Sequence, residues 1–206
     1  LAFEVLDYAL LSAPGAPLKQ ALLDAKIGKD IYGSFEDGIK QTYFSIVAKG
    51  ANLSRKEEFI KVIRDTLTQI AEEGIDKKAV TAGINYYEFR FREADFSSYP
   101  KGLMYGLDIL SSWLYDDTKP FCEVQLLEGF EFLKKALEEG YFEELIRKYL
   151  LDNTHGAILS LVPEKGLAAK RDKELEEKLE NYRKSLSDEE LTQMVEHTKA
   201  LEAYQE

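Results

Sequence analysis

The two histidines are the side chains best suited to catalysis in this sequence, and they stand far apart, at His155 and His197. A hydrolytic zinc site needs three protein ligands that converge while one coordination position stays open. Neither histidine begins the H-x-x-E-H spacing of zinc peptidases or its inverted form. We therefore expect His155 to stand at the entrance of a strand, donating to backbone or water, and His197 to lie on a solvated helix face. The sequence predicts no catalytic residue and no metal ligand.

Nucleophilic chemistry has equally little support. Cys122 is the single cysteine and lies between Phe121 and Glu123, with no basic neighbour to lower its pKa. We expect a buried structural thiol, and one cysteine can form neither an internal disulfide nor a cysteine zinc cluster. The sequence also lacks the G-x-S-x-G, G-x-G-x-x-G and G-x-x-x-x-G-K-[ST] patterns. Adjacent acids such as Glu57 and Glu58 are expected on solvated helix faces, because the chain carries 38 acidic residues.

One polar cluster stands out, in the run Glu88-Phe89-Arg90-Phe91-Arg92-Glu93. Charged residues beside bulky apolar ones on a largely buried helix must be paired, since an unpaired buried charge is costly. We therefore take Glu88, Arg92 and Glu93 as candidates for a structural ion pair that ties this helix to its neighbour. The alternative is contact with a substrate, and the sequence identifies no substrate-binding residue.

The elements that would position these residues follow from hydrophobic periodicity and turn signals. Two β-rich runs flank the turn dipeptide Asp37-Gly38 and predict adjacent antiparallel strands. The run Tyr87–Arg92 alternates like a strand, but an unbroken 3.6-residue period favours a helix. An apolar stretch after residue 155 predicts one more strand. The expected helices are 1–11, 18–26, 54–74, 76–93, 100–114, 126–137 and 142–150, and the expected strands are 30–36, 42–48 and 155–162.

The last forty residues differ in composition from the rest of the chain. Mixed charges at i,i+4 spacing surround apolar residues that recur every three or four positions. Ser187 and Glu190 match a capping box, as Ser54 and Glu57 do earlier. Two helices joined by one tight corner predict an antiparallel hairpin, whose narrow seam should pack against something else.

The length and net charge of the chain limit the classes of function that it can have. The 206 residues suit one large domain, or a domain with an appendage, and the formal net charge of −11 argues against nucleic-acid binding. No apolar run reaches the roughly 20 residues of a membrane span, and no signal peptide is recognisable. The chain opens at Leu1 in helical phase without an N-cap residue. We expect excision from a longer chain, the alternative being a processed mature terminus.

Six short stretches, in order, resemble the middle of the presequence proteases, which belong to the pitrilysin and insulinase class of zinc metallopeptidases. Each is weak alone, but together they run nearly end to end. The stretches are Pro14–Leu22, Glu88-Phe89-x-x-Arg92-Glu93, Tyr99–Leu103, Trp113-x-Tyr115-Asp116, Leu150–His155 and Leu186–Leu191.

The resemblance implies an α+β fold, a roll like that of the mitochondrial processing peptidases, in which several helices pack on an antiparallel sheet and a helical hairpin follows. Residues 1–165 would be a non-catalytic second domain, incomplete at its N-terminus, and 166–206 a hairpin linker. The parent would hold zinc and its general base on H-x-x-E-H in the first domain, with an Arg–Tyr pair in the last domain. The implied partners are the remaining domains and unfolded peptide substrates, with no nucleic acid and no membrane. The implied location is the bacterial cytoplasm, or an organelle matrix in a eukaryote.

Our leading hypothesis is therefore a chamber-wall and hinge segment of a zinc-dependent metalloendopeptidase, inactive alone. The alternative is a free-standing α+β interaction module that docks a partner through its C-terminal hairpin. An unrecognised hydrolase that uses the carboxylate-rich surface is a third reading.

Overall fold

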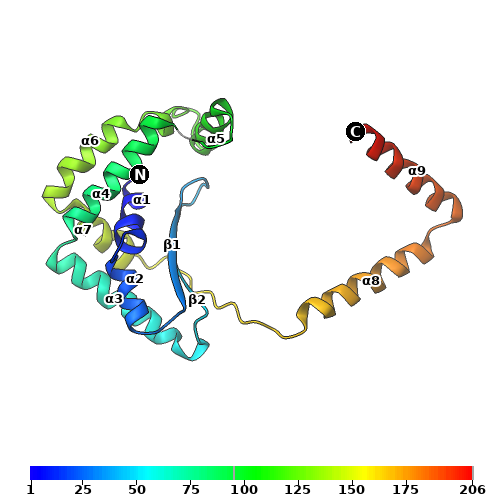
Figure 1. Ribbon diagram of the computed structural model, residues 1–206, viewed down its shortest axis with the longest axis horizontal. Coiled ribbons are helices and arrows are strands. Elements are labelled where there is room, and N and C mark those ends of the chain that lie inside the picture. Colours follow the sequence, from blue (N-terminus) through cyan, green and yellow to red (C-terminus); the bar gives the residue numbers. More distant parts are fainter. Residues whose placement is uncertain (95, 206) are drawn as a thin grey trace. The chain divides into compact units, whose positions relative to one another are not determined.

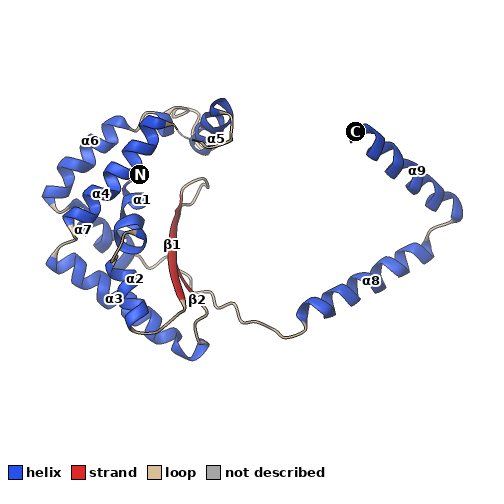
Figure 2. Cartoon of the chain, viewed as in Figure 1, coloured by secondary structure: helices blue, strands red, loops and turns tan. Residues whose placement is uncertain are grey.

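The computed structural model describes residues 1–94 and 96–205, which fall into two compact units, 1–158 and 159–206. The described part of the chain is mostly helical with one antiparallel sheet (Figures 1 and 2), so the expected α+β class is confirmed. The first unit holds α1 (Ala2–Asp7), η1 (Tyr8–Ser12), α2 (Pro17–Asp24), β1 (Asp30–Glu36), β2 (Tyr43–Lys49), η2 (Leu53–Arg55), α3 (Lys56–Glu73), α4 (Lys77–Glu93), α5 (Lys101–Trp113), η3 (Cys122–Val124), α6 (Leu127–Ala136), η4 (Leu137–Glu139), α7 (Tyr141–Leu145) and η5 (Ile146–Leu151). The second unit holds α8 (Leu167–Ser185) and α9 (Asp188–Gln205).

The two strands form the predicted antiparallel pair, with Gly33 opposite Ile46 and Ile31 opposite Ala48. Alternation puts Ile31, Gly33 and Phe35 on the face that packs against α1, η1 and α2. The opposite face carries Tyr32 and other exposed side chains. Helices therefore cover one face of the hairpin (Figure 1).

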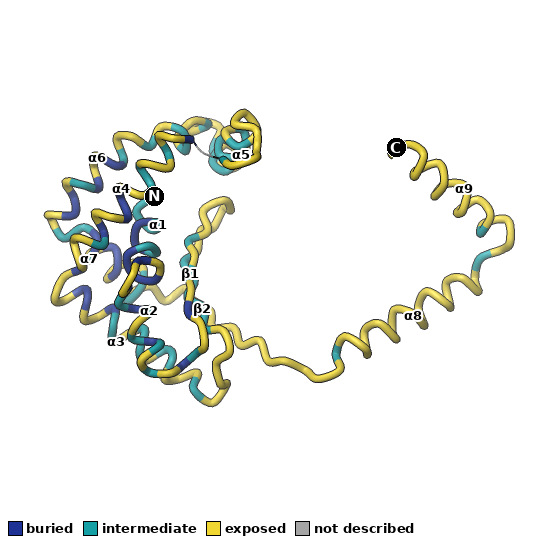
Figure 3. The backbone as a smooth tube through the Cα atoms, in the orientation of Figure 1, coloured by how far each residue is buried: buried dark blue, intermediate teal, exposed yellow. Residues whose placement is uncertain are grey.

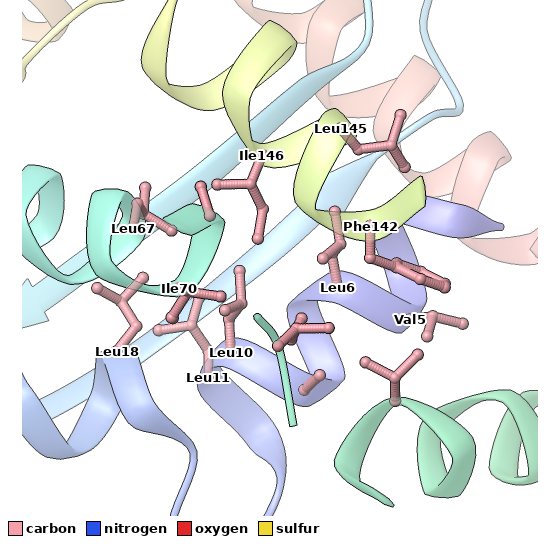
Figure 4. Packing of buried hydrophobic residues seen from close by; sticks show 14 of the residues in the cluster. Val5, Leu6, Leu10, Leu11, Leu18, Leu67, Ile70, Phe142, Leu145 and Ile146 are labelled. Carbon is pink, nitrogen blue, oxygen red and sulfur yellow. The ribbon is translucent and has the colours of Figure 1, made fainter. Parts of the chain in front are cut away.

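The core of the first unit is built around α1 and the π-helical turn η1. Val5, Leu6, Leu10 and Leu11 are fully or almost fully buried there. Figure 4 shows them among side chains from α2, α3, α7 and η5, and Figure 3 shows the buried residues gathered in this region of the unit. Burial of such side chains is the main favourable term in folding, so this cluster holds the helices against the hairpin.

The predicted helix starts at residues 54 and 76 have different outcomes. Asp76 Oδ1 accepts hydrogen bonds from the backbone amides of Lys78 and Ala79, at 2.8 and 3.3 Å, so Asp76 caps α4, whose predicted range began at this residue. The capping box predicted at Ser54 is wrong. Asn52 Oδ1 accepts from both the backbone amide and the hydroxyl of Ser54, because the 3₁₀ turn η2 begins the helical region one residue earlier.

The strand predicted over 155–162 is also wrong. No regular element spans these residues, and Leu159 and Leu161 are more than four-fifths exposed. A strand needs a neighbour for its backbone hydrogen bonds, and in the described sheet β1 and β2 pair only with each other. His155 instead lies beside Gln41, with His155 Nδ1 3.0 Å from Gln41 Nε2.

Helix α5 forms where predicted but contributes no buried residue to the core. Leu103, Leu107, Leu110 and Leu114 lie three or four positions apart and are all exposed. The thiol predicted to be buried, Cys122, is exposed in η3, which packs mainly on α5. The prediction was wrong because the segment around this cysteine is itself outside the core.

The second unit confirms the capping box at its corner. Ser187 Oγ accepts from the amide of Glu190 at 3.2 Å, while a Glu190 carboxylate oxygen accepts from the amide of Ser187 at 2.8 Å. Neither α8 nor α9 has a buried residue, and Leu175, Leu179 and Leu201 are more than half exposed (Figure 3). The packing of the two apolar seams against one another remains a prediction, as do the domain limits 1–165 and 166–206.

Candidate functional site

The polar cluster singled out in the sequence lies on the second half of α4. Glu88 Oε1 accepts from the Arg92 guanidinium at 2.6 Å, one helical turn away, and Glu88 Oε2 binds Lys134 Nζ of α6 at 2.7 Å. The Glu88 side chain is 12% exposed, whereas Glu93 is exposed and forms no ion pair with a described residue. The structure thus brings Glu88 and Arg92 together and leaves Glu93 apart.

Lys134 is the partner that sequence reasoning missed. It joins α6 to α4 through Glu88, and it also binds Glu131 on its own helix at 2.8 Å. Hydrogen bonds from Lys134, and then from Arg92, hold the pKa of Glu88 below its usual range. A carboxylate bound by two cations is poorly suited to proton transfer at neutral pH, and the contact with Lys134 joins α4 to α6.

A second polar group lies where α1 faces the hairpin. Burial raises the pKa of Asp7, and the hydrogen bond from Ser12 partly opposes this rise. Burial also raises the pKa of Glu4. The amino group of Leu1, 3.4 Å from the Glu4 carboxylate, partly opposes this rise, whereas the charge of Asp37 in the hairpin loop adds to it. Burial, with the nearby charges of Glu4 and Asp7, raises the pKa of Tyr87 to about 12.

Burial, and then the charge of Asp37, also raise the pKa of Asp108 of α5. Each of these shifts favours the neutral form of the carboxyl. The sequence offered a signal for Asp7, a polar residue directly beside the apolar stripe of Leu6 and Leu10.

A zinc site does not fit these residues. No three His, Cys, Asp or Glu side chains converge closely enough to hold a metal ion within residues 1–94 and 96–205. His155 and His197 are both exposed and lie in different units. The thiol of Cys122 lies 3.5 Å from the carboxylate of its neighbour Glu123, which is not an arrangement that activates a nucleophile.

The aromatic residues of α4 divide between core and surface. Phe91 packs on Phe130 with ring centroids 5.9 Å apart, and Tyr87 is partly buried against the core. Tyr86 stacks on Tyr8 at 5.5 Å and stays partly exposed, while Phe89 is exposed. Half of this aromatic set therefore packs against the core. Two hollows on the described surface, one beside Arg92 and Phe132 and one beside Leu175 and Leu179, are not lined by these rings.

Comparison with known proteins identifies the class. Residues 1–87 match the family model of the peptidase M16 inactive domain, and residues 161–206 match the model of the region associated with subfamily C of the same peptidases. The chain belongs to the M16 peptidase family, and its first unit contains the domain that this family describes as inactive. The family predicted from the sequence is therefore confirmed.

Within that family the chain is of the presequence-protease type. It is 44% identical over its full length to protein HypA of Clostridium perfringens, and 33% identical over its full length to presequence protease 1, chloroplastic/mitochondrial, of Arabidopsis thaliana. It is 29% identical, over 94% of its length, to the mitochondrial presequence protease of Xenopus laevis. The chain spans 21%, 19% and 19% of these relatives, about a fifth of their length. None of the helices in the described residues is long and apolar enough to cross a membrane.

Proposed function

We propose that this chain is a non-catalytic chamber-wall and hinge segment of a zinc-dependent metalloendopeptidase that degrades unfolded peptides. The observation that carries the proposal is the match of residues 1–87 to the inactive domain of the M16 peptidases. The lack of converging metal ligands in the described residues agrees with it, because zinc and its general base would then belong to another domain of the parent.

The division into two units supports the wall and hinge roles. The first unit offers a packed core with a two-stranded sheet on one side, which suits a rigid wall. The second unit is two helices without a buried residue, which suits a connector that packs against other domains of the parent. We place the parent in the bacterial cytoplasm, or in an organelle matrix if its source is eukaryotic.

The first test measures peptide hydrolysis by the purified 206-residue chain with added zinc and a fluorogenic peptide. We expect no turnover above buffer, because no described group can bind the metal and activate water. A full-length presequence protease assayed in parallel shows that the peptide is a substrate. Cleavage by the chain that a chelator abolishes and zinc restores would refute the proposal.

A second candidate is a free-standing interaction module that docks a partner through α8 and α9. The observation that favours it is the exposure of the apolar residues on both helices, including Leu179 and Val195. The reading frame upstream of Leu1 separates the two candidates. An upstream H-x-x-E-H with a further glutamate supports the peptidase, and a start codon close to Leu1 supports the module.

A further inference from the structure

The most unusual polar contact in the first unit lies between α1 and the β1–β2 hairpin. Asp7 is the last residue of α1, and its Oδ1 atom is buried without a hydrogen-bond partner. Its other oxygen, Oδ2, accepts a long hydrogen bond of 3.4 Å from the hydroxyl of Ser12. No described Lys, Arg or His lies within ion-pair distance of this carboxyl, so its charge would have no counterion.

The π-helical turn creates this arrangement. In η1 the backbone hydrogen bond spans five residues, as between the amide of Ala13 and the carbonyl of Tyr8. The same spacing separates Asp7 from Ser12, so the widened turn brings the hydroxyl back beside the carboxyl. An ordinary helical turn would instead place residue 11 over residue 7.

The hairpin packs against this carboxyl at Gly33. A Cβ atom on Gly33 would lie 2.8 Å from Asp7 Oδ1, 2.7 Å from the carbonyl oxygen of Ser45 and 2.3 Å from Leu11 Cδ1. The strand backbone therefore comes close to the carboxyl, and the other two atoms nearest to this Cβ position are an apolar methyl carbon and a carbonyl oxygen. Neither can stabilise a negative charge.

We propose that Asp7 is a proton-linked latch that holds the β1–β2 hairpin on α1 in its neutral form and loosens it when ionised. The titratable and charged groups on the neighbouring elements are Glu4, one turn earlier on α1, and Tyr87 and Arg90 of α4. The charges of Glu4 and Asp7 raise the pKa of Tyr87, and Arg90 lowers it. The pKa of Asp7 itself is set by its burial and by the hydrogen bond from Ser12, with no contribution from a cation.

The direction of the pH effect follows from burial. Because burial raises the pKa of Asp7 in the folded chain, the folded state binds this proton more tightly than the unfolded state. The neutral form therefore favours a docked hairpin at low pH. This advantage is lost as the pH rises from the unfolded pKa through the folded one.

The test is amide hydrogen exchange of the 206-residue chain between about pH 4 and pH 7, expressed as protection factors to remove the direct effect of pH on exchange. In the native sequence we expect the protection of β1 and β2 amides to fall several-fold relative to α6 amides as the pH rises. In Asp7→Asn, which keeps the shape without the charge, that fall should disappear. In Asp117→Asn, which changes an exposed acid elsewhere in the unit, the fall should remain.

A second variant keeps the carboxyl and tests the same idea in a different way. Ser12→Ala removes the hydrogen bond that lowers the pKa of Asp7, so the loss of hairpin protection should move to higher pH. This variant decides the question if Asp7→Asn does not fold. Equal pH profiles for the native chain and Asp7→Asn, or an unmoved profile in Ser12→Ala, would overturn the proposal.

Discussion

At the scale of single residues, the carboxylate of Glu88 binds Arg92 on its own helix and Lys134 on α6. The charges of Glu88 and Arg92 beside aromatic residues indicated an internal ion pair, and the structure joins these two side chains at 2.6 Å. The third partner, Lys134, lies on another helix, far along the chain, and has no local signature. Long-range partners depend on how α4 and α6 pack, which periodicity does not specify.

Glu88→Gln should destabilise the first unit by roughly 1 kcal/mol, because it leaves Lys134 and Arg92 without their shared carboxylate. Since the pKa of Glu88 is lowered in the folded state, this contribution is present above the ordinary pKa of an unfolded glutamate and is lost as the pH falls through the folded pKa. Urea unfolding at neutral and at acidic pH measures both effects. Glu93→Gln is the control, because Glu93 is an exposed acid of the same helix that has no ion pair with a described residue. A Glu88→Gln loss no larger than that of Glu93→Gln would contradict this stabilising role of Glu88.

At the scale of elements, the close packing of the β1–β2 hairpin on α1 and η1 depends on Gly33. Gly33→Ala should cost about 1 to 3 kcal/mol, because the added methyl would overlap Leu11 and the carbonyl oxygen of Ser45. Gly106→Ala is the matched control. It lies inside α5 with no atom within 4 Å of a new Cβ, so alanine there should stabilise by about 0.5 to 1 kcal/mol. Thermal unfolding of both variants gives the comparison, and equal effects would show that the hairpin adapts around Gly33.

The elements that the sequence predicted well are those whose signals are local. The hairpin of β1 and β2, the helix over Tyr87–Arg92 and the corner at Ser187 follow from spacing and turn chemistry alone. The errors share a different cause. A strand over 155–162 and a buried Cys122 both require neighbours that the described chain does not place there. The latch residue Asp7 was missed because its environment is created by Gly33, which lies on another element.

For the whole molecule, the proposed hinge makes a prediction about the full-length peptidase. Leu179→Pro would interrupt α8 at a cost of about 3 kcal/mol. We expect peptide turnover to fall while the bound zinc stays unchanged, because the change would act on domain closure. Leu179→Ala, which removes apolar surface but preserves the helix, should have a smaller effect. Unchanged turnover in the proline variant would argue against a hinge in α8.

The exposed position of α5 also determines the fluorescence of the chain's tryptophan. Its last residue, Trp113, is the single tryptophan of the chain and is 48% exposed. Tryptophan emission therefore arises from a helix outside the core, and it will change little when the cluster around Leu6 and Phe142 unfolds. The same emission would shift to shorter wavelength if another part of the parent covered α5, so it can be used to test whether α5 becomes covered.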